Sequence, residues 1–373
     1  MKIHLTTFKT MGLATVAVAM ATLLATGAGA ATIKWDTGLV MPEDPVVNSY
    51  GDIDLDTLNI ASTVTTTINV ATGGSLTFKE MNLTKDDAAK DPTGTLVVNG
   101  SGQVAVGTSG LSIGRGATGI LTLNNSASVT VNGTLNVGRA YAGVGSGTVN
   151  MNGGSLSATG SSYLGNGADC FGGIYQTGGA VSFTGFFYMG NATGADAEYV
   201  ISGGSLNIVK PNETSTNAHL YVGRTAGDAT AQLKIIGSAA TVDVARSLLL
   251  CPGGTLAYVM DDSTNHITTI TAYGTTFYAG TLLDLSLLGF TPSDGQVFDL
   301  ITVTSSFANL ANLSLVGWDS LAGNTNKLKN AQWEVALSTD SKTLQATYIA
   351  VPEPATMALL GLGLVGLVAR KRR

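Results

Sequence analysis

The sequence predicts an all-β protein that folds as a right-handed parallel β-helix, a solenoid of short strands. Three observations favour this fold: a repeat with a period of about 25 residues, period-two alternation of apolar and polar residues, and glycine or asparagine at the bends. Charged residues make up 12% of the 373 residues, about half of the usual ~25%. This low charge excludes a nucleic-acid binder, and a hydrophobic content of 44% excludes a disordered chain.

The first 30 residues predict a secretory signal peptide. Lys2 and Lys9 precede an uncharged apolar run, and Ala28 and Ala30 supply the small residues that a signal peptidase recognises before its cleavage site. Signal peptidase is therefore the first expected partner, and Ala31 is the expected start of the mature chain.

Residues 31–93 predict an N-terminal cap and the first strands, among them a strand from Thr63 to Val70. Within this region three aspartates alternate with apolar residues, and alternate residues of a strand share one face. These aspartates are Asp52, Asp54 and Asp56. Their carboxylates could hold Ca²⁺, the one cofactor that the sequence suggests. A solvated edge strand without a metal explains the same pattern, so both interpretations stay open.

Residues 94–260 predict the β-helix repeats. Six segments align on a shared turn: Leu96–Gly100, Leu121–Asn125, Val149–Gly153, Ile174–Gly178, Tyr199–Gly203 and Leu233–Gly237. Their turn residues are 25, 28, 25, 25 and 34 positions apart, and the longest spacing is explained by an insertion at Lys210–Glu213. No single unit can bury its apolar face alone, so stacked neighbours must share one core.

Two side-chain columns follow from this register. Asn99, Asn124 and Asn152 recur at the same turn and are expected to stack as an amide ladder. A second set of glycines is expected to lie in one column along the axis: Gly114, Gly138, Gly165 and Gly190. A β-propeller is the alternative fold, although its blades need about 40 residues or more.

Residues 261–350 predict a C-terminal β cap, because the turn glycines stop and Phe, Trp and Leu become more frequent. Strands are expected at Phe298–Val303 and Leu344–Ile349. Such a cap shields the edge of the last coil from pairing with other chains.

Residues 351–373 predict a membrane segment. Pro352, Glu353 and Pro354 precede an uncharged run from Ala355 to Ala369, and the chain ends in four basic residues, Arg370, Lys371, Arg372 and Arg373. As a helix the run is about 22 Å long, which flanking residues can extend toward the ~30 Å hydrocarbon core of a bilayer. The basic end is expected to stay in the cytoplasm.

The tripeptide Pro352–Pro354, the short apolar run and the basic end together resemble the PEP-CTERM sorting signal of Gram-negative bacteria. This resemblance implies processing by an exosortase, export across the inner membrane, transient membrane anchoring, and a final place at the cell surface or in the extracellular matrix. The repeats together with this tail also resemble the autotransporter-like β-strand repeat proteins that often carry such signals.

Candidate catalytic groups are sparse in the mature region. His219 and His266 lie 47 residues apart and match no metal-binding motif. Recurrent arginines, Arg115, Arg139 and Arg224, could form a basic stripe like that of β-helix polysaccharide lyases, but capping of corner carbonyls is the favoured role. Cys170 and Cys251 are predicted to be unpaired, because about three rungs separate them, roughly 14 Å against a ~7 Å limit for a disulfide.

The function expected from these patterns is that of an exported, surface-sorted, non-enzymatic structural protein of the cell envelope or extracellular polysaccharide matrix. Without the two terminal segments the chain carries 13 basic and 24 acidic residues, a net charge of −11 that repels anionic polysaccharide. One alternative is a polysaccharide-binding adhesin, which would align exposed aromatic residues on one face: Tyr141, Tyr163, Phe187, Tyr188 and Tyr221. A polysaccharide lyase is the other alternative.

Overall fold

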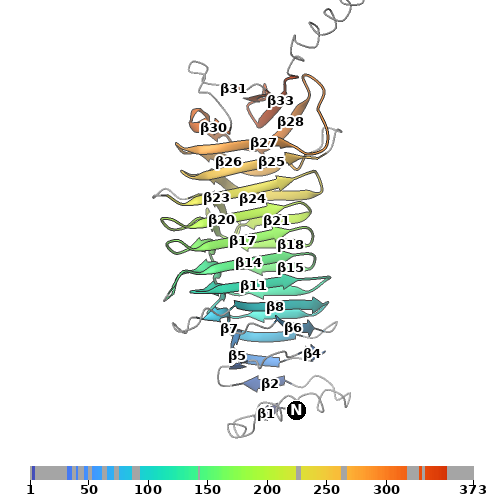
Figure 1. The fold of residues 1–373 in the computed structure, drawn as a ribbon, viewed down its shortest axis with the longest axis vertical. Helices are drawn as coiled ribbons and strands as arrows, with labels where there is room; N and C mark the ends of the chain where they lie inside the picture. Colours follow the sequence, from blue (N-terminus) through green and yellow to red (C-terminus); the bar gives the residue numbers. More distant parts are fainter. Residues whose placement is uncertain are drawn as a thin grey trace, which may run out of the picture.

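The computed structural model describes residues 2–4, 32–35, 39–40, 46–48, 53–60, 65–70, 75–85, 93–141, 143–223, 228–261, 267–316, 327–329 and 332–350, with side chains described from residue 75 onward except at 85 and 327–329. These residues form a tall stack of parallel strands, with the N-terminal strands at one end and the strands β28, β31 and β33 at the other (Figure 1). The described part of the chain is almost entirely β structure, as predicted.

Each regular coil contributes one strand to each of three faces. The first face is an 11-stranded parallel sheet within the described residues. Its strands are β4 (Val46–Asn48), β6 (Thr65–Val70), β8 (Thr93–Gly100), β11 (Thr118–Leu123), β14 (Ser146–Met151), β17 (Phe171–Gln176), β20 (Asp196–Ile201), β23 (Thr230–Ile236), β25 (Gly254–Met260), β27 (Thr281–Leu287) and β30 (Leu313–Leu315).

The second and third faces are joined by long strands that run across the bend between them. These are β5 (Ile53–Ile60), β7 (Ser75–Lys85), β24 (Ala240–Leu250) and β26 (Ile270–Phe277). The second face also holds β1 (Lys2–His4), β2 (Thr32–Trp35), β9 (Gln103–Val106), β12 (Ser128–Val131), β15 (Ser155–Ala158), β18 (Ala180–Thr184), β21 (Gly204–Val209) and β28 (Val297–Val303). The third face also holds β3 (Leu39–Val40), β10 (Leu111–Arg115), β13 (Leu135–Arg139), β16 (Ser162–Asn166), β19 (Phe186–Met189), β22 (His219–Val222) and β29 (Phe307–Ala308).

The register of the stack matches the repeat that the sequence predicts. The parallel pairings place one inward residue of each unit over the next: Leu96, Leu121, Val149, Ile174, Tyr199 and Leu233. These side chains are wholly buried, and they belong to one continuous apolar core that runs from Leu76 to Tyr348. The parallel pairing continues through β26, β28 and β30, further along the chain than the turn glycines extend.

The predicted glycine column is confirmed at the corner that follows the third face. Gly114 and Gly138 lie between the paired residues of β10 and β13, and Gly165 and Gly190 continue the column. All four have positive φ angles between 63° and 72°. Glycine adopts this left-handed backbone without the steric penalty that a β-carbon brings, so the repeat needs glycine there.

The C-terminal end of the second face is closed by an antiparallel sheet. β33 (Thr343–Tyr348) pairs with β28 on one side and with β32 (Trp333–Leu337) on the other, and β31 (Lys327–Lys329) extends the sheet. The strands predicted at Phe298–Val303 and Leu344–Ile349 are therefore confirmed within one residue. A single 3₁₀ turn, η1 (Leu310–Asn312), precedes β30. We call β28 and β31–β33 the C-terminal cap.

Candidate functional site

The most distinctive surface lies on the third face, where outward side chains of successive coils form one column. We call this column the outer stripe, and its members are Asn82, Ser112, Asn136, Tyr163, Tyr188 and Tyr221. Parallel pairing in strict register places these side chains one above another. The stripe is polar and buried in the coils of β7, β10 and β13, where these side chains are at most 7% exposed, and it is aromatic and partly exposed in those of β16, β19 and β22.

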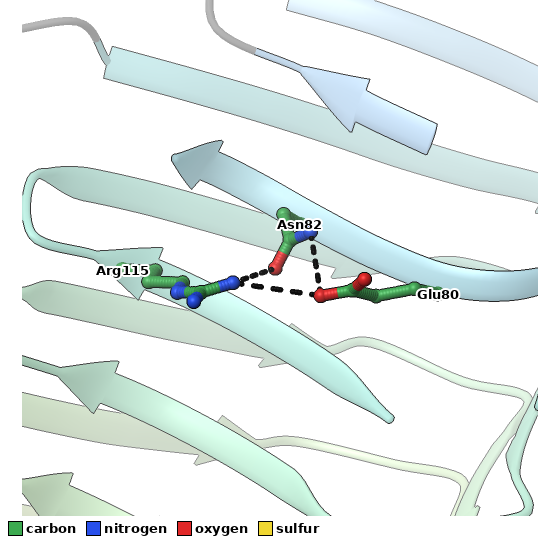
Figure 2. A network of polar contacts seen from close by, with 3 residues as sticks. All are labelled: Glu80, Asn82 and Arg115. Carbon is green, nitrogen blue, oxygen red and sulfur yellow. Dashed lines mark hydrogen bonds and ion pairs between the residues drawn. The ribbon is translucent and has the colours of Figure 1, made fainter. Parts of the chain in front are cut away.

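Arg115 organises the polar half of the outer stripe. Its Nη1 lies 3.5 Å from Glu80 Oε1 and 3.5 Å from Asn82 Oδ1, and Asn82 Nδ2 donates to Glu80 Oε1 at 3.1 Å (Figure 2). The guanidinium also lies 4.0 Å from the centre of the Tyr141 ring. The expectation that Arg115 caps corner carbonyls is wrong, since it contacts a carboxylate, an amide and an aromatic ring. Sequence reasoning missed Glu80 because no acidic residue recurs at its position in the later coils.

The predicted register of Arg115 and Arg139 is confirmed, Lys85 occupies the same position one coil earlier, and an amide ladder replaces the basic residues in the following coils. Arg115 pairs in register with Arg139, which pairs with Asn166. Asn166 Nδ2 donates to Asn136 Oδ1 at 2.6 Å, and Asn191 Nδ2 donates to Asn166 Oδ1 at 2.9 Å. Arg224 lies outside the described residues.

The other amide ladder is confirmed on the first face. Asn124 Nδ2 donates to Asn99 Oδ1 at 2.9 Å, and Asn152 Nδ2 donates to Asn124 Oδ1 at 2.9 Å. Each amide thus bonds to its equivalent in the preceding coil. A ladder of this kind stabilises the stack, because each donor group reaches an acceptor in the neighbouring coil.

The aromatic half of the outer stripe is a stack of rings. The Tyr163 and Tyr188 ring centres are 5.3 Å apart with planes 10° apart, and those of Tyr188 and Tyr221 are 4.7 Å apart with planes 21° apart. These spacings are close to the distance between neighbouring strands. The rings therefore face one another along the axis, and a sugar could approach mainly their edges and hydroxyl groups.

Two further rings flank the aromatic half, and the sequence reasoning did not select them for this site. Phe186 and His219 are paired in register, and their ring centres are 5.6 Å apart. Burial lowers the pKa of His219, and the charge of Arg246 acts in the same direction. Period-two alternation could have revealed Phe186, because it lies two residues before Tyr188 and so shares its face.

The five aromatics expected on one face divide into three groups. Tyr163, Tyr188 and Tyr221 lie in one column, as the adhesin alternative requires. Phe187 points into the core and is wholly buried, because it has the opposite parity on β19. Tyr141 lies in the loop after β13 and is 54% exposed.

The calcium hypothesis is not decided by the described residues. Asp52 lies outside them, and Asp54 and Asp56 lie on β5, whose side chains are not described. Among the side chains that are described, no group of three or more His, Cys, Asp or Glu residues could hold a metal ion. The site at Asp52, Asp54 and Asp56 stays a prediction.

The two cysteines are free, as predicted, and both are buried. The Sγ of Cys170 accepts a hydrogen bond from the backbone N–H of Gly145 at 3.2 Å, and burial raises the pKa of this thiol. Burial raises the pKa of Cys251 to about 11. Both thiols are therefore protonated at neutral pH, which makes them poor nucleophiles.

Comparison with known families gives one result, at the C-terminal end of the chain. Residues 350–373 match the PEP-CTERM protein-sorting motif. This match covers Pro352–Pro354 and the basic end, and it supports the interpretation of the chain as an exosortase substrate that is exported and sorted to the cell surface of a Gram-negative bacterium. No curated protein matches the chain.

Apart from Lys2–His4, both terminal segments lie outside the described residues. The cleavage residues Ala28 and Ala30, the motif Pro352–Pro354, the run Ala355–Ala369 and the basic end Arg370–Arg373 are among them. Within the described ranges, no helix is long and apolar enough to span a bilayer.

Proposed function

We propose that this chain is an exported structural protein of the cell envelope or extracellular polysaccharide matrix, without enzymatic activity. In this proposal residues 1–30 are removed by signal peptidase, and residues 355–369 form a transmembrane helix that anchors a right-handed solenoid until an exosortase releases it. The match of residues 350–373 to the PEP-CTERM protein-sorting motif is the observation that carries the proposal. A motif of this kind specifies where a protein goes, so the solenoid itself must supply the role.

The chemistry of the solenoid surface supports a scaffold. Its outward amides bond along the axis to equivalent amides, and its outward tyrosines stack on equivalent tyrosines. These groups therefore use part of their binding capacity within the stack. Interactions that repeat from coil to coil stabilise a long rod in proportion to its length.

The sorting step can be tested by replacing both prolines of the motif, Pro352→Ala and Pro354→Ala, and fractionating the cells. The unchanged protein is expected to lose its tail and reach the surface or matrix fraction, whereas the variant keeps its tail and stays with the membranes. Pro211→Ala is the matched control, because Pro211 is an exposed proline in the inserted loop. An unchanged distribution of the double variant would contradict the proposal.

The tyrosine column favours a second candidate, a polysaccharide-binding adhesin. Tyr163, Tyr188 and Tyr221 repeat at nearly the spacing of the coils and present a row of hydroxyl edges. Strong retention on a glycan array that is lost in Tyr188→Ala would favour an adhesin over a bare scaffold.

The lyase alternative has its own test. Release of unsaturated sugars from polyuronate in the presence of Ca²⁺ would support it and would contradict the non-enzymatic proposal. The double variant Asp54→Asn and Asp56→Asn would then show whether these aspartates hold the metal.

A further inference from the structure

The sorting segment leaves the solenoid from a fixed point on the molecule. We call residues 288–296 the terminal loop, which connects β27 to β28. The N–H of Gly295 donates to the carbonyl of Tyr348 at 2.9 Å, and the N–H of Tyr348 donates to the carbonyl of Gln296 at 2.8 Å. The N–H of Ala350 donates to Asp294 Oδ1 at 2.9 Å. The chain is therefore held against the terminal loop up to the first residue of the matched motif.

Little chain separates this fixed point from the apolar run. Five residue steps lead from Ala350 to Ala355, and the two prolines in between favour an extended conformation of about 3.1 Å per residue. The run thus begins within roughly 16 Å of Ala350. The headgroup layer of a bilayer is about 5–8 Å thick on each side of its hydrocarbon core. A solenoid tethered this closely has its terminal loop at the membrane surface.

Apolar side chains are exposed in and beside the terminal loop. Large hydrophobic side chains that remain exposed include Leu288 in the terminal loop, 58% exposed, and Val297 at the start of β28, 41% exposed. Phe290 of the terminal loop is partly buried against the core. Apolar side chains on an otherwise polar surface are typical of regions that enter the interface of a bilayer.

We propose that the terminal loop rests on the lipid bilayer while the sorting segment is anchored in it, with Leu288 and Phe290 reaching the headgroup layer. This inference rests on the proposed function, because it requires that residues 355–369 enter the membrane. The apolar side chains of the terminal loop thus contact the same bilayer that holds the tail. The solenoid then stands with its C-terminal end on the membrane, the end opposite to the N-terminal strands in Figure 1.

An environment-sensitive dye at position 288 tests this contact. The full-length chain carrying Leu288→Cys would be labelled and reconstituted into phosphatidylcholine and phosphatidylglycerol vesicles that contain nitroxide-labelled lipid. The native Cys170 and Cys251 are buried, so the added thiol is labelled selectively. The matched control is Thr159→Cys, at an exposed corner in the middle of the solenoid. We expect at least twofold stronger quenching at 288 than at 159.

Protection of the basic end from trypsin shows independently whether the tail has inserted. If the tail is protected and the dye at 288 is quenched no more than at 159, the docking inference is overturned while the proposed function stands. If the tail is not protected, both are overturned. A ten-residue Gly/Ser insertion after Ala350 lengthens the tether, and loss of quenching at 288 with the tail still protected would support the short tether as its cause. Quenching that survives the insertion would support an affinity of the apolar loop itself for lipid.

Discussion

We call the coils with corners at Gly114 and Gly138 the lower coils and those with corners at Gly165 and Gly190 the upper coils. Both follow the same path, yet their corners are packed differently. A β-carbon added to Gly138, in the lower coils, would lie 1.7 Å from the carbonyl oxygen of Phe171. A β-carbon added to the equivalent Gly190, in the upper coils, would have its nearest neighbour at 3.4 Å, in ordinary contact. The φ angles are almost the same, 71° and 67°. The backbone conformation is thus constant along the solenoid, while the space beside it is not.

The residues facing these corners explain the difference. The inward position opposite the corner is Gly147 and Gly172 in the lower coils and becomes Ala197 and Ala231 in the upper coils. One coil further on it is glycine again, Gly254, and a β-carbon added to Gly223 would lie only 2.8 Å from the Gly254 nitrogen. Where glycine faces glycine, the two backbones approach directly. Where alanine is present, its methyl group keeps them apart, so the corner is wider. The corner glycine of each repeat therefore fixes the path of the chain, and the volume of the side chain that faces it sets how closely the two backbones approach.

The largest expected effect comes from Gly138→Ala, and Gly190→Ala is its matched comparison. Gly190→Ala should cost about 1–2 kcal/mol, the penalty of a left-handed backbone for a residue with a β-carbon. Gly138→Ala adds an overlap with a carbonyl oxygen and should cost about 3–5 kcal/mol, in the range of severe core changes. Urea unfolding followed by circular dichroism measures both.

The ratio of the two losses in the free energy of unfolding tests whether the lower and upper corners are packed differently. Equal losses would show that the lower corner relaxes as easily as the upper one. If Gly138→Ala fails to fold, amide hydrogen exchange in Gly190→Ala still tests it, because only the amides of the upper coils should then exchange faster.

Most of the fold follows from short-range patterns in the sequence. The register of the six units is readable because equivalent residues recur about every 25 positions, and the ladder of Asn99, Asn124 and Asn152 follows from that register alone. Parallel stacking turns any recurrence in sequence into a contact in space. The cap strands were readable for a different reason, since β28 and β33 are apolar strands outside the repeat.

The contacts that the sequence did not predict join residues that do not recur. Glu80 is the partner of Arg115, but no acidic residue occupies the equivalent place in later coils, so no repeat points to it. The expectation that Phe187 and Tyr188 share one exposed face is wrong, because adjacent residues of a strand point to opposite faces and Phe187 is buried. Period-two alternation counted from Tyr188 places Phe186 on the outer face and Phe187 in the core.

The second-largest effect is expected in the aromatic half of the outer stripe. Tyr188→Ala removes a half-buried ring and three stacked contacts, each worth about 0.5–1.5 kcal/mol, so the free energy of unfolding should fall by about 2–3 kcal/mol. Ser112→Ala, at the same register in the lower coils, should cost about 0.5 kcal/mol or less. Thermal and urea unfolding of both variants give the comparison. A loss for Ser112→Ala as large as that for Tyr188→Ala would contradict a stabilising role specific to the rings.

The smallest effect is expected at the ion pair of the polar half. Glu80→Gln keeps an acceptor for Asn82 and removes only the charge opposite Arg115, whose side chain is 14% exposed while that of Glu80 is 32% exposed. A separation of 3.5 Å at a partly solvated site is worth about 0.5–1 kcal/mol. In 1 M salt, where the screening length is about 3 Å, the difference between the variant and the unchanged protein should shrink.

The cation–π contact with Tyr141 allows this effect to be separated from packing. A double-mutant cycle between Glu80→Gln and Tyr141→Leu should show little coupling if the carboxylate and the ring hold the guanidinium independently. Suppose that Glu80→Gln lowers the free energy of unfolding as much as Tyr188→Ala does, and that 1 M salt does not reduce this loss. Polar side chains would then hold the lower coils together. The close glycine corners would then be a consequence of that side-chain network, and the explanation given for the difference between lower and upper coils would have to be reversed.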